Sequence, residues 1–280
     1  MASVKLDICD FELFYDTISN MTKISKSAKI TFSKHGFRTS VKTDGRVARL
    51  DVVSTSVRIN GEPVSICTQE LNVFSQILYK VIKAHAPKSK KSSSAPDYSD
   101  VELTIEDETS IRIKSSTFKT NFGLVKEAAI VVLKDHVHSW NTIAEVNVEL
   151  DDVKELLSST FVFRDQKDLL VRICHQDDMV KNTAYAEIYD PKDPASNKFV
   201  TKFGNIMVGD LTRKILLDIP RFQVISIFPV ESMVIKLNQQ PCAFTDFAIK
   251  GGDGSCVTKY TLLFEYMSDN YAAVNNGSAA

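Results

Sequence analysis

The sequence predicts an α+β protein of two domains, each of which packs two helices on antiparallel sheets. Three observations support this fold class. The chain has 280 residues, about twice the common length of one domain. Short alternating runs typical of half-buried strands are interrupted by amphipathic segments typical of helices. These elements occur twice in the same order, as strand, helix, strands, helix and strands, which indicates a duplicated unit.

The first half of the chain predicts two helices among short strands. Asp10 is a candidate N-cap, and the apolar residues after it recur at spacings of three and four, which predicts a helix over 11–26. A second amphipathic helix is expected from about Thr68. The alternating runs between and after these helices predict strands, including a hairpin whose turn is Asn60-Gly61.

The second half repeats this order. A short helix is expected after Leu150, and a fourth helix is expected from Val208 to Pro220, because its apolar residues recur every four positions and proline stops a helix. Helix starts in the two halves are then about 140 residues apart. The remaining runs predict strands at 143–149, 168–175, 182–190, 198–208, 223–229, 232–239, 242–250 and 257–266.

The domain boundaries follow from this pattern. We expect a first domain at 1–125, an interdomain connector at 126–142 and a second domain at 143–267. The last residues, 268–280, are expected to form a flexible tail. Residues 86–99 are rich in proline, serine and lysine, which predicts a flexible loop inserted in the first domain.

Composition excludes several classes of protein. The net charge of −1 excludes a protein that is basic overall but leaves a local basic face open. The acidic residues near the start argue against a secreted protein, and no apolar run reaches the roughly eighteen residues of a membrane span. The chain is therefore expected in the cytoplasm. Its five cysteines are odd in number and widely spaced, which favours buried, reduced thiols over a disulfide framework.

Signals of catalysis are weak, so we expect a protein that is not an enzyme and has no cofactor. His136 and His138 are two residues apart, but no carboxylate or cysteine accompanies them at the spacing of metal ligands. The glycine-rich segment 251–254 lacks the lysine and the following helix of a phosphate-binding loop, and is expected to be a hairpin turn.

Several stretches in fixed order carry a family resemblance over residues 3–267. The first half contains DFELFYDTISNM, KITFSKHGFRTSVKTDGRVARLDV and TQELNVFSQILYKV, and the second contains VELDDVKELLSS, GDLTRKILLDIPRFQVISIFPVESMVIKLNQQPCAFTDFAI and TKYTLLFEY. This ordered set resembles the DNA sliding clamps, especially the trimeric clamps of T-even-type phages and the proliferating cell nuclear antigen-like clamps of eukaryotes and archaea.

The resemblance implies a homotrimeric ring of six domains, with helices lining a hole and strands forming the outer sheets. Such a processivity factor encircles duplex DNA without reading its sequence, tethers a replicative polymerase through its C-terminal peptide, and is opened by an ATP-driven clamp loader. The resemblance also suggests a phage protein, located in the cytoplasm of a bacterial host. Two alternatives stay open: a structural, β-rich phage or virion protein, and a monomeric DNA-binding processivity factor.

Basic residues on the predicted helices are the candidate DNA contacts, because an encircled duplex requires positive charge facing its phosphates. The alternative is that these charges only solvate a helix face. The third helix departs from the pattern, since its acidic residues outnumber Lys154, and it is expected to matter less. The candidate DNA-binding residues are Lys23, Lys26, Lys80, Lys83, Arg213, Lys214 and Arg221.

The resemblance also implies a subunit interface, in which an edge strand at 117–125 pairs with a strand at 182–190 of the next chain. The alternative is that both strands lie inside their own sheets. Pairing would remove exposed strand edges, which are prone to aggregation. The expected interface residues are Thr117, Lys119, Asn121, Ala184, Ala186 and Ile188.

A partner-peptide pocket beneath the connector is the last implication of the resemblance. The connector supplies an apolar run at 130–133, which is unusually hydrophobic for an idle linker and could instead be an extra strand of the first domain. The expected pocket residues are Val47, Val131, Leu133, Pro241, Tyr260 and Leu262.

Overall fold

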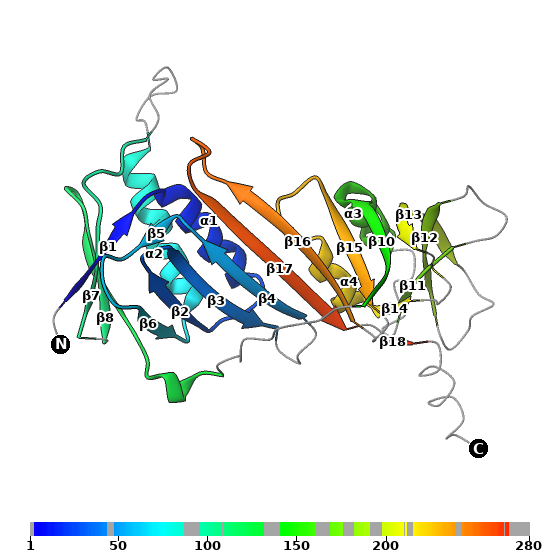
Figure 1. Cartoon of the computed structure of the whole chain (residues 1–280), viewed down its shortest axis with the longest axis horizontal. Coiled ribbons are helices and arrows are strands. Elements are labelled where there is room, and N and C mark those ends of the chain that lie inside the picture. The colour runs from blue at the N-terminus through cyan, green and yellow to red at the C-terminus, as the bar shows by residue number, and fades with distance from the viewer. Residues whose placement is uncertain are drawn as a thin grey trace. The chain divides into compact units, whose positions relative to one another are not determined.

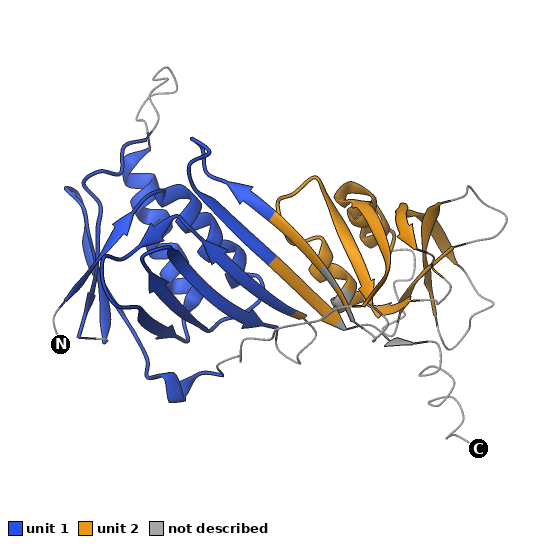
Figure 2. Ribbon diagram, in the orientation of Figure 1, with its two compact units in different colours: residues 1–44, 49–136, 248–260 blue, residues 45–48, 137–247, 261–280 orange. Residues whose placement is uncertain are grey.

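The computed structural model of the chain divides into two compact units, coloured separately in Figure 2. Unit 1 comprises residues 1–44, 49–136 and 248–260, and unit 2 comprises residues 45–48, 137–247 and 261–280. The structure describes residues 3–43, 48–86, 96–107, 109–131, 141–160, 169–175, 182–190, 198–209, 211, 215–238, 242–265 and 267–268.

Both units pack helices on antiparallel strands, which confirms the α+β prediction (Figure 1). In unit 1 one sheet has the strand order β5-β1-β7-β8-β9, and four further strands pair in the order β4-β3-β2-β6. Its elements are β1 (Val4–Ile8), α1 (Phe11–Thr22), β2 (Ala28–Ser33), β3 (Gly36–Lys42), β4 (Ala48–Ser54), β5 (Val57–Arg58), β6 (Val64–Thr68), α2 (Leu71–His85), β7 (Glu102–Glu106), β8 (Ser110–Lys114) and β9 (Lys119–Gly123).

Helix α1 begins where the sequence predicts. The Asp10 Oδ1 atom accepts a hydrogen bond from the Leu13 backbone N–H at 2.8 Å, and Asp10 has the extended backbone of an N-cap. From this cap, the apolar spacing turns Phe14 and Ile18 into the core, where both are fully buried.

We expect Asp10→Ala to lower the free energy of unfolding by about 1 kcal/mol, because a free N–H at the start of α1 loses its acceptor. Asp10→Asn, which keeps an acceptor oxygen, should lose much less. Denaturant unfolding of both variants checks this, and equal losses would show that the cap does not stabilise α1.

The core of unit 1 joins aromatic rings from both helices and the sheets. Phe14 on α1 makes edge contacts with Phe37 and Phe74 at ring-centroid distances of 5.5 and 6.2 Å. Phe74 on α2 stacks on Phe122 of β9 at 4.9 Å. These contacts cover the apolar faces of α1 and α2. The two helices are therefore stabilised by packing more than by helix propensity.

A buried hydroxyl network explains why residues 248–260 belong to unit 1. The Thr258 hydroxyl lies 2.8 Å from those of both Thr17 on α1 and Ser54 on β4. All three side chains are fully buried. Buried hydroxyls are costly without partners, so this network specifies how the start of β17 (Val257–Glu265) pairs beside β4.

In unit 2 the strands follow the order β18-β14-β11-β12-β13-β10-β15-β16. Strands β16 and β17 contribute residues to both units. The remaining elements are β10 (Thr142–Glu149), α3 (Leu150–Ser158), β11 (Leu170–Cys174), β12 (Thr183–Tyr189), β13 (Phe199–Gly209), β14 (Ile215–Asp218), α4 (Ile219–Ile225), β15 (Ser232–Asn238), β16 (Cys242–Lys250) and β18 (Met267–Ser268).

Strand pairing shows the predicted internal repeat. Strand β1 lies between β5 and β7, and β10 lies correspondingly between β13 and β15. Strand β2 lies between β3 and β6, and β11 lies between β12 and β14. The single long strand β13 therefore occupies the positions that β4 and β5 share in unit 1.

The prediction of a fourth helix over 208–220 is wrong. Strand β13 continues to Gly209, β14 follows, and α4 only begins at Ile219. Ile215, Leu216 and Leu217 are all buried, a continuous run that suits a strand covered on both faces. Pro220 lies in the first turn of α4, where its missing N–H costs nothing. The strand predicted at 223–229 is instead the end of α4 and the turn after it.

Candidate nucleic-acid interface and assembly edges

Helix α2 presents a polar stripe opposite its buried face. Leu71, Phe74, Leu78 and Val81 are buried, whereas the exposed positions recur along the other side of the helix. Lys80 and Lys83 are exposed, as a DNA-facing role requires. The stripe consists of Asn72, Gln76, Tyr79, Lys80 and Lys83, and every member can donate a hydrogen bond to a phosphate oxygen.

Two tyrosines stiffen this surface. Tyr15 on α1 and Tyr79 on α2 stack at a centroid distance of 5.7 Å, and the Lys83 Nζ atom lies 5.2 Å from the Tyr79 ring centroid. Tyr79 is 44% exposed. Neither tyrosine is among the predicted DNA contacts, although Tyr79 lies between polar residues of one helix face in the sequence.

The exposed side of α1 is less basic than predicted. Lys23 and Lys26 are exposed, but Glu12 and Asp16 are exposed beside them. Desolvation, followed by the charge of Glu12, raises the pKa of the Asp16 carboxyl. The Lys23 Nζ donates to Asn20 Oδ1 at 3.0 Å, and partial burial lowers the pKa of Lys23. This surface is therefore weaker as a phosphate contact than the polar stripe of α2.

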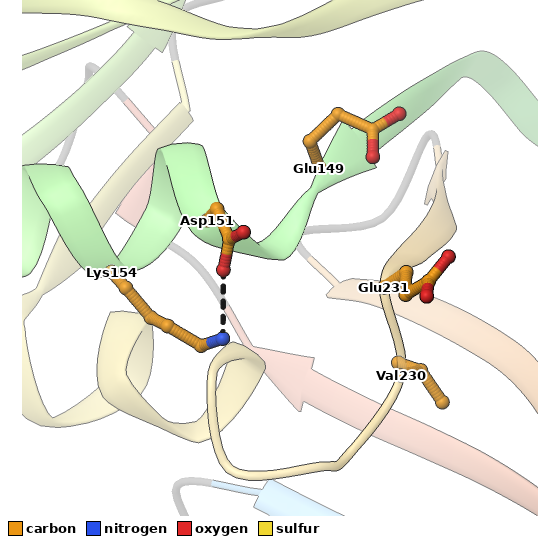
Figure 3. Close-up of a pocket in the computed structure, with 5 residues that line it drawn as sticks. All are labelled: Glu149, Asp151, Lys154, Val230 and Glu231. Atoms are coloured by element: carbon orange, nitrogen blue, oxygen red, sulfur yellow. Dashed lines mark hydrogen bonds and ion pairs between the residues drawn. The ribbon is translucent and has the colours of Figure 1, made fainter.

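Helix α3 is acidic, as the sequence indicates. Its only lysine, Lys154, donates to Asp151 Oδ1 at 2.9 Å (Figure 3). Glu149 and Glu231 line a hollow of about 490 Å³ beside this pair, together with Val230. Carboxylates at a helix N-terminus stabilise the helix by interacting with its dipole, but they repel phosphate. A structural role explains these charges better than DNA binding.

The remaining predicted DNA contacts are not placed. Arg213 and Lys214 lie outside the described residues. Arg221 belongs to α4, but its side chain also lies outside what the structure describes. Of the predicted set, the described side chains on helix α2 carry the clearest basic surface.

Strand β9 is an edge strand, as predicted: among the described strands it pairs only with β8. The Phe118 carbonyl accepts a hydrogen bond from the Ser115 N–H, and the Leu124 N–H donates to the Thr109 carbonyl. The backbone N–H and C=O groups of the even-numbered residues of β9 therefore face β8. Because backbone groups alternate along an antiparallel strand, those of Lys119 and Asn121 point outward. Thr117, just before the strand, is also exposed.

The predicted partner edge at 182–190 is wrong. Strand β12 pairs with β11 on one side and β13 on the other, and Ala184, Ala186 and Ile188 are fully buried. A free edge lies one strand further along the chain. Residues 199–202 of β13 pair with β12, whereas the pairing of β13 with β10 begins at Asn205. Within the described part of the chain, the other side of residues 199–202 has no strand partner.

The predicted peptide pocket is only partly placed. Val131 follows the 3₁₀ helix η2 (Glu127–Ala129) and is 67% exposed, and residues 126–131 contain no strand. Val47, Leu133 and Pro241 lie outside the described residues. Tyr260 and Leu262 are wrongly assigned, since they are 1% and 0% exposed. Alternation along β17 points both side chains into the core, so neither can contact a docked peptide.

A cluster of hydrogen bonds joins the C-terminal end of α2 to Asp100 and Ser116. The His85 Nδ1 bonds the Val81 carbonyl and its Nε2 bonds Asp100 Oδ1, each at 2.8 Å, so the doubly bonded ring is best satisfied as an imidazolium. Asp100 also accepts from the Ser116 backbone N–H at 2.8 Å. The bond to Val81, followed by the bond and charge of Asp100, raises the pKa of His85.

This cluster predicts a pH dependence of stability. A raised pKa in the folded state means that the His85 contribution is complete below the ordinary value of 6.5 and is lost as the pH rises through the folded pKa. The free energy of unfolding should therefore fall as the pH rises above about 6.5. His85→Gln should flatten that slope in urea titrations, and an unchanged slope would assign it to other groups.

The described parts of the chain lack two other features. They contain no group of three or more potential ligand side chains that could hold a metal ion. Nor do they include a helix with the length and apolar character needed to cross a bilayer.

Comparison with solved structures identifies the architecture. Proliferating cell nuclear antigen from Entamoeba histolytica matches with a TM-score of 0.60 at 15% identity, covering 95% of this chain and 98% of the other. The chain has the sliding-clamp fold. A. fulgidus PCNA, bound to the C-terminal region of FEN-1, matches at 0.64 and 15% identity, with the same coverage. A PCNA2–PCNA3 complex from Sulfolobus tokodaii matches at 0.57 and 9% identity, covering 95% and 99%.

The clamp fold spans almost the whole chain, so both units are accounted for. At the level of sequence the likeness is much weaker. No family model matches the chain. No curated protein matches it by sequence either.

Proposed function

We propose that this chain is a DNA sliding clamp: a non-enzymatic ring of three identical chains that encircles duplex DNA and tethers a replicative polymerase. The observation that carries the proposal is the clamp fold, which extends over 95% of the chain and nearly the full length of the matched proteins. In this proposal the clamp is of phage type and acts in the host cytoplasm. An ATP-driven loader opens it.

Ring closure is proposed to join β9 of one chain to the free edge of β13 in the next. Each edge has backbone groups without a strand partner among the described residues. Joining head to tail around a closed ring would cover every such edge, because each chain offers one of each kind. The complex of two clamp chains from S. tokodaii supports assembly through this fold.

The DNA contact is proposed to rest mainly on Lys80 and Lys83, supported by Lys23 and Lys26. Arg213, Lys214 and Arg221 remain further candidates. Amide, hydroxyl and ammonium donors along α2 can contact phosphates without reading bases. A ring that slides requires weak attraction through water, and the mixed charges of α1 and the acidic α3 keep the attraction weak.

The polymerase peptide is proposed to dock at the segment after η2, where Val131 exposes an apolar side chain. Val47, Leu133 and Pro241 remain candidates for the same surface. The A. fulgidus clamp binds the C-terminal region of FEN-1, which supports peptide docking on this fold.

Val131→Glu is expected to weaken binding of the polymerase C-terminal peptide by about tenfold, because it places a charge in an apolar contact. Ring formation should not change. Fluorescence anisotropy of a labelled peptide measures the first effect and native mass spectrometry the second. Unchanged peptide affinity would remove Val131 from the contact surface.

Retention on circular and linear DNA tests the clamp itself. After loading, a linked ring should stay on closed circles when the salt concentration is raised, but slide off linear DNA of the same sequence. A monomeric DNA-binding factor would leave both substrates alike, because it binds through charge alone. A virion protein would load on neither. Either result would overturn the proposal.

A further inference from the structure

Cys9 and Cys256 both lie against one short backbone segment in unit 1. The Cys9 N–H donates to the Ser56 carbonyl at 2.8 Å. At the preceding residue, the Thr55 N–H donates to the Val257 carbonyl at 3.0 Å, and the Cys256 Sγ lies 3.7 Å from the Thr55 carbonyl oxygen. Residues far apart in the chain are thus fixed around the turn between β4 and β5.

Packing around Gly251 places the same two regions together. A Cβ atom added to Gly251 would lie 1.9 Å from Asp10 Oδ2 and 3.7 Å from the Cys256 Cβ, so there is no room for a side chain. Asp10 directly follows Cys9 and caps α1. The β1–α1 junction and the start of β17 are therefore in direct contact.

The two thiols also interact with each other. Burial is the main cause that raises the pKa of the Cys9 thiol, and a hydrogen bond with Cys256 adds to it. The Arg58 guanidinium pairs with Asp7 at 2.7 Å. Its positive charge acts to lower the pKa of Cys9, and it also interacts electrostatically with Cys256. The Arg58 cation therefore offsets only part of the effect of burial, and the pKa of Cys9 stays above its ordinary value.

Their exposure differs in a way that suits a two-step oxidation. Cys9 is exposed, contrary to the expectation that the cysteines are buried, whereas Cys256 is buried. A dissolved oxidant can therefore reach Cys9 first, and Cys256 is positioned to react next. This is the arrangement of an accessible thiol with a resolving thiol.

We propose that Cys9 and Cys256 form a reversible disulfide bond when the protein meets a peroxide or a small-molecule disulfide. The bond is a covalent link between the β1–α1 junction and the start of β17. It is a modification site independent of the DNA and peptide contacts.

The chemistry balances with hydrogen peroxide as the oxidant. The Cys9 thiolate attacks one peroxide oxygen, the O–O bond breaks, and hydroxide leaves as water after protonation, giving a sulfenic acid. The Cys256 sulfur then attacks the Cys9 sulfur, the S–O bond breaks, and a second water leaves. Two thiols lose two electrons in total and one peroxide is reduced to two waters. A small dithiol reverses the reaction by exchange.

The link should hold β17 against unit 1. Cross-linking segments far apart in the chain restricts the unfolded state, so oxidation should raise the melting temperature by roughly 5 °C. Backbone amides at 257–260 should exchange with solvent more slowly, because the strand can no longer open away from β4.

Alkylation after oxidation tests the proposal on the full-length protein. The reduced protein has five cysteines and should take up five N-ethylmaleimide groups under denaturing conditions. After treatment with hydrogen peroxide it should take up two fewer, and peptide mapping should find Cys9 joined to Cys256. Cys67→Ser is the matched control, and should still lose two reactive thiols on oxidation.

Cys9→Ser and Cys256→Ser should each form no disulfide within the chain, and neither should show the rise in melting temperature. Three outcomes would overturn the proposal. They are full alkylation after oxidation, a disulfide that joins two chains, and a pairing that involves another cysteine.

Discussion

Asn121→Pro is expected to convert the proposed trimeric ring into monomers. The backbone groups of Asn121 point away from β8, so proline at this position removes an outward donor while the β8–β9 ladder stays intact. Proline is tolerated on a free strand edge, which means that the chain itself should fold normally. The loss should be nearly complete, because the proposed ring has three identical joints and each would depend on the same strand.

Native mass spectrometry at micromolar concentration measures this result, with circular dichroism to show that the fold is retained. Asn121→Thr is the matched control, since threonine keeps the backbone donor and suits a strand. Thr120→Pro is a poorer test, because the Thr120 backbone points toward β8 and its loss would damage the sheet. A trimeric Asn121→Pro protein would place the subunit interface elsewhere.

The double variant Lys80→Glu/Lys83→Glu should lose more than about tenfold in association with duplex DNA at low salt. Each chain changes by four charge units on the polar stripe of α2, and a ring repeats the change three times. Because neutralised phosphates release counterions, the salt dependence of the remaining binding should also become shallower.

Lys34→Glu/Lys250→Glu makes the same change in net charge at exposed positions that are not part of a helix, and should have a much smaller effect. Lys154→Glu should likewise matter little, since Lys154 already pairs with Asp151. Binding curves at several salt concentrations compare the three proteins. Equal losses in all of them would mean that net charge, rather than α2, governs the attraction.

Features that depend on neighbouring residues in the chain could be predicted from the sequence. The apolar spacing after Asp10 specifies α1 and its cap, and the exposed lysines of α2 follow from the same periodicity. The repeat was visible because both halves keep one order of elements. These features are local, so hydrophobic period and capping chemistry suffice to find them.

Features that depend on distant partners could not be predicted in this way. Alternation along 182–190 is the same for an edge strand and an internal one, and only the pairing with β11 and β13 distinguishes them. Ile215 and Ile219 fit a helical spacing although they lie in β14 and α4. Tyr260 is expected in the peptide pocket from the resemblance, but its hydroxyl lies beside Thr17 in the core. In each case tertiary contacts override the local pattern.

The hydroxyl network of unit 1 also has a consequence for biosynthesis. Ser54 and Thr258 are hydrogen-bonded across 204 residues of sequence, so the first unit cannot be completed until β17 has left the ribosome. Until then the hydroxyls of Thr17 and Ser54 have only their local partners, the Leu13 carbonyl and the Ser56 hydroxyl, and lack Thr258. The first unit to begin synthesis should therefore finish folding late, and ribosome-bound chains that end before residue 257 should remain sensitive to protease.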